Sequence, residues 1–259
     1  MGKYIMCIVC IFLIGCASQK NGEYFKEISA QDMKELEYAA LVEEKLYTQF
    51  NVTAAHSETM RLNEIAKELK DVSHRPYWPS NVLVITDPGY INACTGGRDI
   101  YVGEGLLNIL ETDDERAYVI AHELAHIDNS HPMKSFESSQ HVGFFRKIGG
   151  YIASIFFAFL PAGSVHPAVS ITAQNSIAMV NQVASDIIYK GYKRSFEIEA
   201  DEDALIMMRT AGFKSVGALT VLTKLEKSTK SSAGGVLSDH PAYDDRIDDM
   251  QKLIENTAL

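Results

Sequence analysis

The sequence predicts an α+β domain that is mainly helical, with a small sheet of about three strands packed beside one central helix. Apolar residues recur at helical spacing over most of the 259 residues, whereas short β-branched runs are confined to residues 82–102. The composition, 46% apolar and 22% charged, suits one domain with a sizeable core. The formal net charge of −10 argues against a nucleic-acid-binding protein, which would need a basic face.

Residues 1–15 have the features of a bacterial lipoprotein signal peptide. Lys3 precedes an apolar stretch, and the Leu-Ile-Gly-Cys sequence ending at Cys16 resembles a lipobox. Cleavage there would leave Cys16 as the lipidated N-terminus, residues 16–30 as a tether and residues 31–259 as one domain. Ala17, rather than Asp, follows the lipidated position and favours the outer membrane. The alternative is an ordinary signal peptide or an uncleaved anchor in which Cys16 is incidental.

Cys94 would then be the one cysteine that is neither removed with the signal nor lipidated. A single thiol in an exported chain forms no intramolecular disulfide, so stability must come from the core and a bound metal. We expect Cys94 to be a small buried residue rather than a zinc ligand or a reactive thiol.

The first half of the domain predicts two helices followed by the sheet. Residues 31–50 and 58–70 carry apolar side chains at helical spacing, and both segments read as amphipathic helices. Residues 82–86 form a β-branched strand, and residues 90–102 read as a hairpin about the turn at 95–97. A helical segment begins at residue 103.

The central helix covers residues 117–130 and contains the sequence H-E-x-x-H. His122 and His126 are four residues apart, so both imidazoles lie on one face and can reach one metal ion. Glu123 lies beside them, where its carboxylate can take a proton from an attacking water. Upstream, Thr112 is the first of three N-cap candidates. The alternative is a core helix whose polar side chains only make hydrogen bonds.

The second half of the domain is predicted to be helical. Residues 148–163 are the most apolar part of the mature chain, but they are too short to span a bilayer. Residues 148–160 are interpreted as a buried or interfacial helix. The remaining predicted segments are helices at 195–208, 214–227 and 244–254, and a Ser/Gly-rich loop at 228–239.

A catalytic zinc site usually has three protein ligands, so the H-E-x-x-H pair requires one more. The candidates are His131, Glu197, Glu199, Asp201 and His240. His131 falls one residue short of the metzincin spacing, which excludes that class. Glu197 and Asp201 lie four apart on one helical face, which would put Glu197 on the metal and Asp201 behind it, bonded to a ligand histidine. The alternative is a solvated acidic face, and Glu199, Glu202 and Asp203 are expected to point outward.

H-E-L-A-H followed by E-I-E-A-D resembles the zinc metallopeptidase family that includes HtpX, BepA, LoiP and the CAAX prenyl protease 1. Residues 91–107 and the sequence from Ser238 to Ile247 resemble two further motifs of that family, and His131 matches a histidine five residues after the metal motif. The resemblance covers roughly residues 81–254. It implies a compact gluzincin-like fold, and the absence of two convincing membrane spans between the metal motifs indicates the periplasmic lipoprotein branch.

The resemblance also implies the role of each site residue. His122, His126 and Glu197 would bind one Zn²⁺ per chain, with Glu123 as general base and then acid to the leaving amine. Asp201, His131 and Arg246 would lie behind the ligands. His240 would stabilise the oxyanion or occupy the open zinc position in a resting state. A peptide substrate would pair with an edge strand formed by Asp99, Ile100, Tyr101 and Val102.

These features predict a membrane-anchored zinc endopeptidase of the bacterial envelope. Its substrates would be unfolded or misassembled envelope polypeptides, and it would associate with the envelope assembly machinery. A second hypothesis is a chaperone-like outer-membrane assembly factor with a largely closed zinc site, although such a protein would not need Glu123. A structural zinc protein is the weakest of the three, because such sites usually use four ligands and more cysteine.

Overall fold

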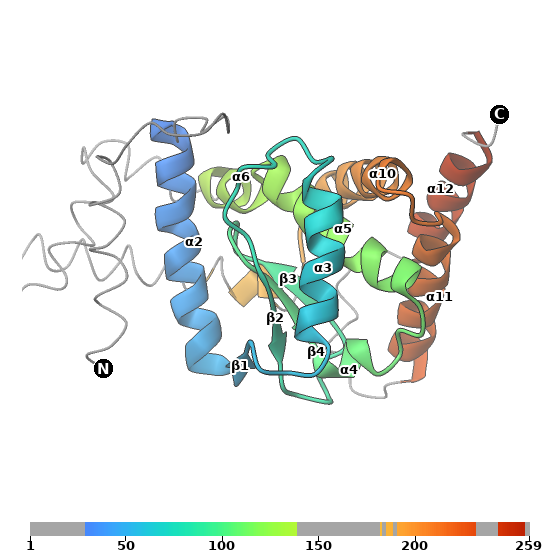
Figure 1. Ribbon diagram of the computed structural model, residues 1–259, viewed down its shortest axis with the longest axis horizontal. Coiled ribbons are helices and arrows are strands. Elements are labelled where there is room, and N and C mark those ends of the chain that lie inside the picture. Colours follow the sequence, from blue (N-terminus) through green and yellow to red (C-terminus); the bar gives the residue numbers. More distant parts are fainter. Residues whose placement is uncertain (1–28, 139–181, 183–184, 189–190, 232–242, 257–259) are drawn as a thin grey trace, which may run out of the picture.

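The computed structural model describes residues 29–138, 182, 185–188, 191–231 and 243–256. Figure 1 shows a central sheet with helices on both sides and the C-terminal helices at one end. The helices are α2 (Ala30–Gln49), α3 (Thr59–Lys70), α4 (Glu104–Leu107), α5 (Asp113–Asp128), α6 (His131–Ser138), α10 (Arg194–Thr210), α11 (Val216–Ser231) and α12 (Tyr243–Asn256). The strands are β1 (Val52–Thr53), β2 (Val82–Ile85), β3 (Ala93–Thr95) and β4 (Ile100–Gly103). The mainly helical α+β class is therefore confirmed.

The sheet has four strands in the order β1-β2-β4-β3, one more than the sequence predicts. The hairpin of β3 and β4 is antiparallel as expected, whereas β2 and β4 pair in parallel. The additional strand β1 has only two residues, too few for an alternating pattern to reveal it. Because β4 is paired on both sides, it lies inside the sheet and not at its edge.

The two faces of the sheet are buried in different cores. Ile100 and Val102 of β4 pack in the larger cluster with α3, α5, α10 and α11, whereas Tyr101 packs in a second cluster with α2 and α6. This alternation follows from the two-residue period of a strand. All four residues of β4 are consequently buried, which explains why that stretch reads as continuously apolar.

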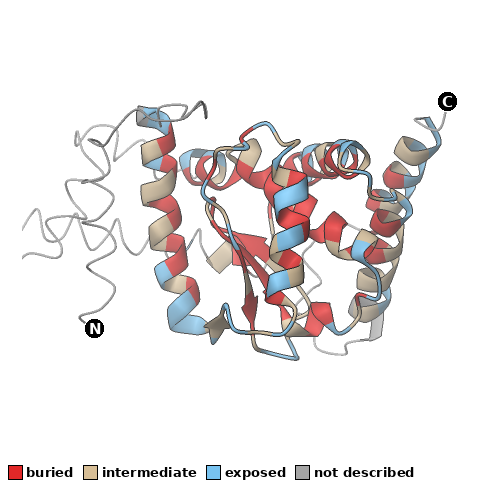
Figure 2. Cartoon of the chain, viewed as in Figure 1, coloured by how far each residue is buried: buried red, intermediate tan, exposed pale blue. Residues whose placement is uncertain are grey.

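α5 is the helix around which the domain is built. It packs against α3, α10 and α11 and also contacts β3 and β4. Most of its residues are buried, and Figure 2 shows much of the visible part of α5 in the colour of buried residues. Thr112 caps its N-terminus: the Thr112 side chain accepts from the N–H of Glu115, and the Glu115 carboxylate accepts from the N–H of Thr112. The same carboxylate binds Lys224 of α11 at 2.9 Å, so the cap also joins two helices.

Helix α2 is held to the domain by ion pairs as well as by apolar contacts. Arg75 binds Asp32 and Glu35 of α2 at 2.6 Å each and lies 3.6 Å from the centre of the Trp78 ring. Further along α2, Glu43 pairs with Arg98. These contacts fix α2 against the face of the sheet opposite α3 and α5.

Several helices differ from the prediction in their boundaries, and one helix was not predicted. α11 continues to Ser231, so the first four residues of the predicted loop at 228–239 are helical. Helix α6 was not predicted, because its eight residues begin directly after the turn that ends α5. The predicted apolar helix at 148–160 lies outside the described residues. Among the residues that the structure does describe, no helix has the length and apolar character needed to cross a membrane.

Candidate metal centre

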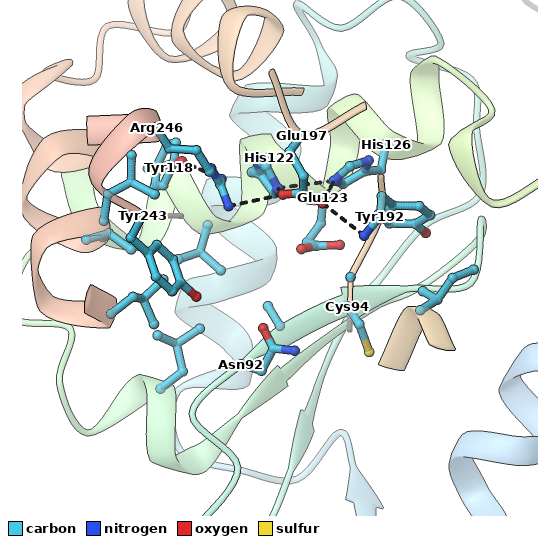
Figure 3. A pocket seen from close by; sticks show the side chains of 18 residues that line it. Asn92, Cys94, Tyr118, His122, Glu123, His126, Tyr192, Glu197, Tyr243 and Arg246 are labelled. Atoms are coloured by element: carbon cyan, nitrogen blue, oxygen red, sulfur yellow. Dashed lines mark hydrogen bonds and ion pairs between the residues drawn. The ribbon is translucent and has the colours of Figure 1, made fainter. Parts of the chain in front are cut away.

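Helices α5 and α10 lie side by side and bring together the two sequence motifs that we singled out. His122 and His126 project from α5, and Glu197 projects from the first turn of α10 (Figure 3). Nε2 of His122 lies 3.1 Å from Nε2 of His126 and 3.3 Å from Oε2 of Glu197. Nε2 of His126 lies 3.7 Å from Oε1 of Glu197. The three side chains therefore converge on one point, as the sequence predicts.

The distances between these atoms fit a tetrahedral metal ion. Bonds of about 2.0–2.1 Å at a tetrahedral centre place neighbouring ligand atoms about 3.3–3.4 Å apart. The observed separations bracket that value: 3.1 Å between the two imidazole nitrogens, and 3.3 and 3.7 Å from these nitrogens to Oε2 and Oε1 of Glu197, respectively. Two imidazoles and one carboxylate also form the donor set typical of catalytic zinc. Within the described residues, this is the one group of three or more potential ligands that could hold a metal.

Arg246 of α12 lies behind the ligands, together with Asp201. Its Nε and Nη2 donate to the two oxygens of Asp201, each at 2.8 Å, and its Nη1 lies 3.1 Å from Glu197. Asp201 also accepts from the hydroxyl of Tyr118 at 2.7 Å, and its Oδ1 lies 2.9 Å from Nδ1 of His122. The Asp201 carboxylate thus fixes Nδ1 of His122 and leaves Nε2 directed at the ligand cluster.

The charges of this network favour a cation between the ligands. Burial alone would lower the pKa of His122, but its contacts with Asp201 and Glu197 raise that pKa to about 10. Burial alone would raise the pKa values of Glu197 and Asp201, but Arg246 and His122 outweigh it and hold both below the usual range. A cluster that stabilises an imidazolium cation in this position would also stabilise a metal cation between the same groups.

Glu123 points away from the ligand network into a cavity. Figure 3 shows its carboxylate directed from α5 toward the strand that carries Cys94. Glu123 is buried, its Oε2 has no hydrogen-bond partner among the described residues, and burial raises its pKa to about 7. The cavity has a volume of about 60 Å³, enough for a few water molecules, and Asn92 and Tyr192 also line it. A buried carboxylate with a pKa near neutrality can both accept and return a proton.

Two tyrosines belong to the site although the sequence analysis did not single them out. Tyr118 lies four residues before His122 on the same face of α5, and this spacing could have identified it. Tyr192 stacks on the His126 ring at 4.0 Å, and its N–H donates to Glu197 at 3.0 Å. Its hydroxyl donates to the carbonyl of Thr95 at 2.8 Å. No local pattern marks Tyr192, because its role depends on how the segment before α10 meets α5 and β3.

The acidic residues of α10 do not all point into solvent as expected. Glu202 is exposed, in agreement with the prediction. Asp203 is half-buried and accepts from the Asn129 side chain at 2.6 Å. Glu199 is 47% exposed, yet its carboxylate lies 3.1 Å from Nε2 of His131. The prediction therefore holds for Glu199 and Glu202, which are exposed, and is wrong for Asp203. α5 ends directly beside α10, where it supplies partners that the acidic run itself does not reveal.

The predicted edge strand is wrong. Ile100, Tyr101 and Val102 belong to β4, which pairs with β2 on one side and β3 on the other, so their backbone groups are already used. Asp99 precedes the strand, and its carboxylate accepts from the N–H of Asn81 at 2.8 Å. Among the described strands, β3 is the edge nearer the cavity, and its Ala93 and Cys94 line that cavity.

Three further predictions concern single residues. Cys94 is 3% exposed, and burial raises its pKa to about 12, which confirms the prediction of a buried, unreactive thiol. His240 and Cys16 lie outside the described residues. Their roles therefore remain proposals.

The fold and the site together define a metallopeptidase-type domain of the H-E-x-x-H class, with its third ligand on a following helix. Residues 56–254 match the family model described as Peptidase family M48. This match covers well over half of the chain, and the chain belongs to peptidase family M48.

Three similar proteins extend the comparison. Mitochondrial metalloendopeptidase OMA1 of Arabidopsis thaliana is 29% identical over 189 residues, which are 73% of this chain and 32% of that protein. A putative beta-barrel assembly-enhancing protease of Vibrio cholerae is 29% identical over 158 residues, 60% of this chain and 31% of that protein. Metalloprotease LoiP of Escherichia coli is 23% identical over 256 residues, 92% of this chain and 90% of that protein. The chain thus spans about a third of the length of the first two relatives.

Proposed function

We propose that this chain is a zinc endopeptidase that is anchored to the bacterial envelope by a lipid on Cys16 and degrades or processes misassembled envelope proteins. The observation that carries the peptidase proposal is the position of Glu123, which is buried beside three converging side chains that could hold a metal and whose Oε2 has no partner among the described residues. A protein that only bound its partners would gain nothing from burying an unpaired carboxylate there.

Zinc held by His122, His126 and Glu197 would act as a Lewis acid that polarises the scissile carbonyl and lowers the pKa of water near it. Glu123 would take one proton from the attacking water as the new C–O bond forms. The same carboxyl would then give that proton to the leaving nitrogen as the C–N bond breaks. Its pKa of about 7 suits both transfers near neutral pH.

Other groups of the site would prepare it for these steps. Arg246 neutralises the charge of Asp201 and Glu197, so that two buried carboxylates can remain ionised beside each other. Tyr192 covers one face of His126 and holds Glu197 through its backbone N–H. His240 is proposed to reach the same site, where it would stabilise the oxyanion or occupy the open zinc position.

The cellular part of the proposal is supported by the sequence and the relatives. The lipobox ending at Cys16 supports attachment to a membrane facing the periplasm, with Ala17 favouring the outer membrane. Two bacterial relatives are named as a beta-barrel assembly-enhancing protease and a metalloprotease. These names support unfolded or misassembled envelope polypeptides as substrates, and an association with the envelope assembly machinery.

A substitution of Glu123 tests the enzyme against the chaperone-like alternative. Glu123→Gln keeps the shape of the side chain but removes its ability to accept a proton. We expect the wild-type chain and the variant to bind one equivalent of zinc, and casein cleavage to fall about 10²–10⁴-fold in the variant. Zinc in both with cleavage in neither would favour the chaperone-like assembly factor. The absence of zinc from the wild-type chain would refute the mechanism.

A further inference from the structure

His131 is placed beside the metal centre by the turn between α5 and α6. Ser130 has a left-handed backbone conformation, with φ of 54°, which reverses the chain just after α5. The reversal brings His131 back against its own preceding helix. The side chain of His131 is completely buried, and its Nδ1 lies 2.8 Å from Nδ1 of His126.

The contacts of His131 form a chain of three groups that leads from the ligand cluster to the surface. Nε2 of His126 faces the other ligand atoms, and its Nδ1 faces His131. Nε2 of His131 in turn lies 3.1 Å from Oε2 of Glu199. Glu199 is 47% exposed on α10, two residues after Glu197. The chain therefore joins α5, α6 and α10 around one side of the centre.

Metal binding would set which group donates in the His126–His131 and His131–Glu199 hydrogen bonds. A neutral imidazole that uses Nε2 as a ligand carries its hydrogen on Nδ1. His126 would then donate to Nδ1 of His131, and His131 would carry its own hydrogen on Nε2 and donate it to Glu199. A carboxylate is the strongest acceptor available for that last bond. If Glu199 is absent, the buried Nε2–H of His131 loses its acceptor, and the tautomer that metal binding requires becomes less favourable.

Aromatic side chains hold the two rings of this chain in place. The His131 ring stacks on Phe196 at 4.0 Å with an interplanar angle of 10°. The His126 ring stacks on Tyr192 at 4.0 Å and 29°. Because packing already determines where the rings lie, the contribution of Glu199 is confined to which nitrogen carries hydrogen.

We infer that Glu199 is a positioning residue for the metal centre: through His131 it fixes His126 in the tautomer that directs Nε2 to the metal. This inference rests on the proposed metal site and adds a residue beyond the ligands and the groups directly behind them. His122 obtains its partner from the buried Asp201, whereas His126 obtains it from an exposed carboxylate through a neutral ring. The two ligand histidines are thus oriented by different means.

The test measures zinc affinity in the purified full chain by competition with a chromophoric chelator. Glu199→Ala should weaken zinc binding about tenfold, the lower end of the effect expected for partners behind a metal ligand. Glu202→Ala is the matched control, because it removes the same charge from an exposed position on the same helix. The thermal midpoint of the chelated protein should be the same in both variants, since neither side chain is buried.

A double substitution distinguishes an effect of Glu199 that is transmitted through His131 from a simple effect of its charge. In a His131→Gln background, Glu199→Ala should have no further effect on zinc affinity, since the connecting ring is gone. Equal losses of zinc affinity in Glu199→Ala and Glu202→Ala would overturn the inference. So would a loss on Glu199→Ala that is as large in the His131→Gln background as in the wild-type chain. If the His131 variant does not fold, the zinc affinities of Glu199→Ala and Glu202→Ala still test the inference. Zinc binding and Glu123-dependent cleavage by the wild-type chain test the proposed function separately.

Discussion

Arg246 allows a quantitative test of how the buried charges and the metal depend on each other. Among the described residues, it is one of two cations that face both Asp201 and Glu197, the other being the His122 imidazolium. The side chains of Asp201 and Glu197 are 6% and 4% exposed. Arg246→Gln removes that charge and most of the hydrogen bonds while keeping a polar, though shorter, side chain. Breaking a buried ion pair by removing one partner typically costs about 3–5 kcal/mol, because the remaining charge stays buried and unpaired.

The loss of unfolding free energy in Arg246→Gln should depend on whether zinc is present. In the chelated protein both carboxylates lose the guanidinium and keep only the His122 imidazolium, and we expect the full loss of about 3–5 kcal/mol. With zinc bound, Glu197 regains a neighbouring positive charge and only Asp201 remains uncompensated, so the loss should be about half as large. The increment in stability on adding zinc should therefore be larger in Arg246→Gln than in the wild-type chain.

Urea unfolding followed by circular dichroism, with zinc and with chelator, measures both losses. Arg194→Gln is the control, because Arg194 also joins α10 to α12, through Asp245, but both side chains are at least half exposed. Its substitution should change stability little, with or without zinc. Equal losses for Arg246→Gln in the two conditions would refute the argument that Arg246 and the metal share the task of neutralising Glu197.

Two further predictions concern residues away from the metal. Burial, aided by the charge of Asp99, raises the pKa of Glu43 to about 7 despite its pairing with Arg98. The folded state therefore holds this proton more tightly than the unfolded chain, and stability should fall by about 3 kcal/mol as the pH rises from about 4.5 to about 7. Glu43→Gln should abolish that dependence in denaturation curves across this range, and an unchanged slope would contradict it. Cys16→Ser should move the chain from the membrane to the soluble fraction after cell lysis, and continued membrane attachment would exclude a lipid on Cys16 as the sole anchor.

The local sequence predicted the parts of the site that lie on single helices. The four-residue spacings of His122 and His126, and of Glu197 and Asp201, place each pair on one face of a helix whatever the helix packs against. The H-E-x-x-H motif then made it reasonable to expect the two helices to meet. The N-cap at Thr112 was likewise among the predicted candidates, because its capping interaction spans only three residues.

Tertiary structure decided which strand lies at the edge and which acidic side chains have partners. The alternation and turns of residues 90–102 indicated a hairpin but could not show that β2 pairs with β4, because β3 and its flanking turns separate these strands in the sequence. Glu199 pairs with His131, and Asp203 pairs with Asn129, because the C-terminal end of α5 lies against α10. The sequence by itself determined which side chains on each helix share a face and are candidate ligands, because this depends on helical periodicity alone. Only the tertiary structure determined the groups behind them, because these are brought together by packing between distant segments.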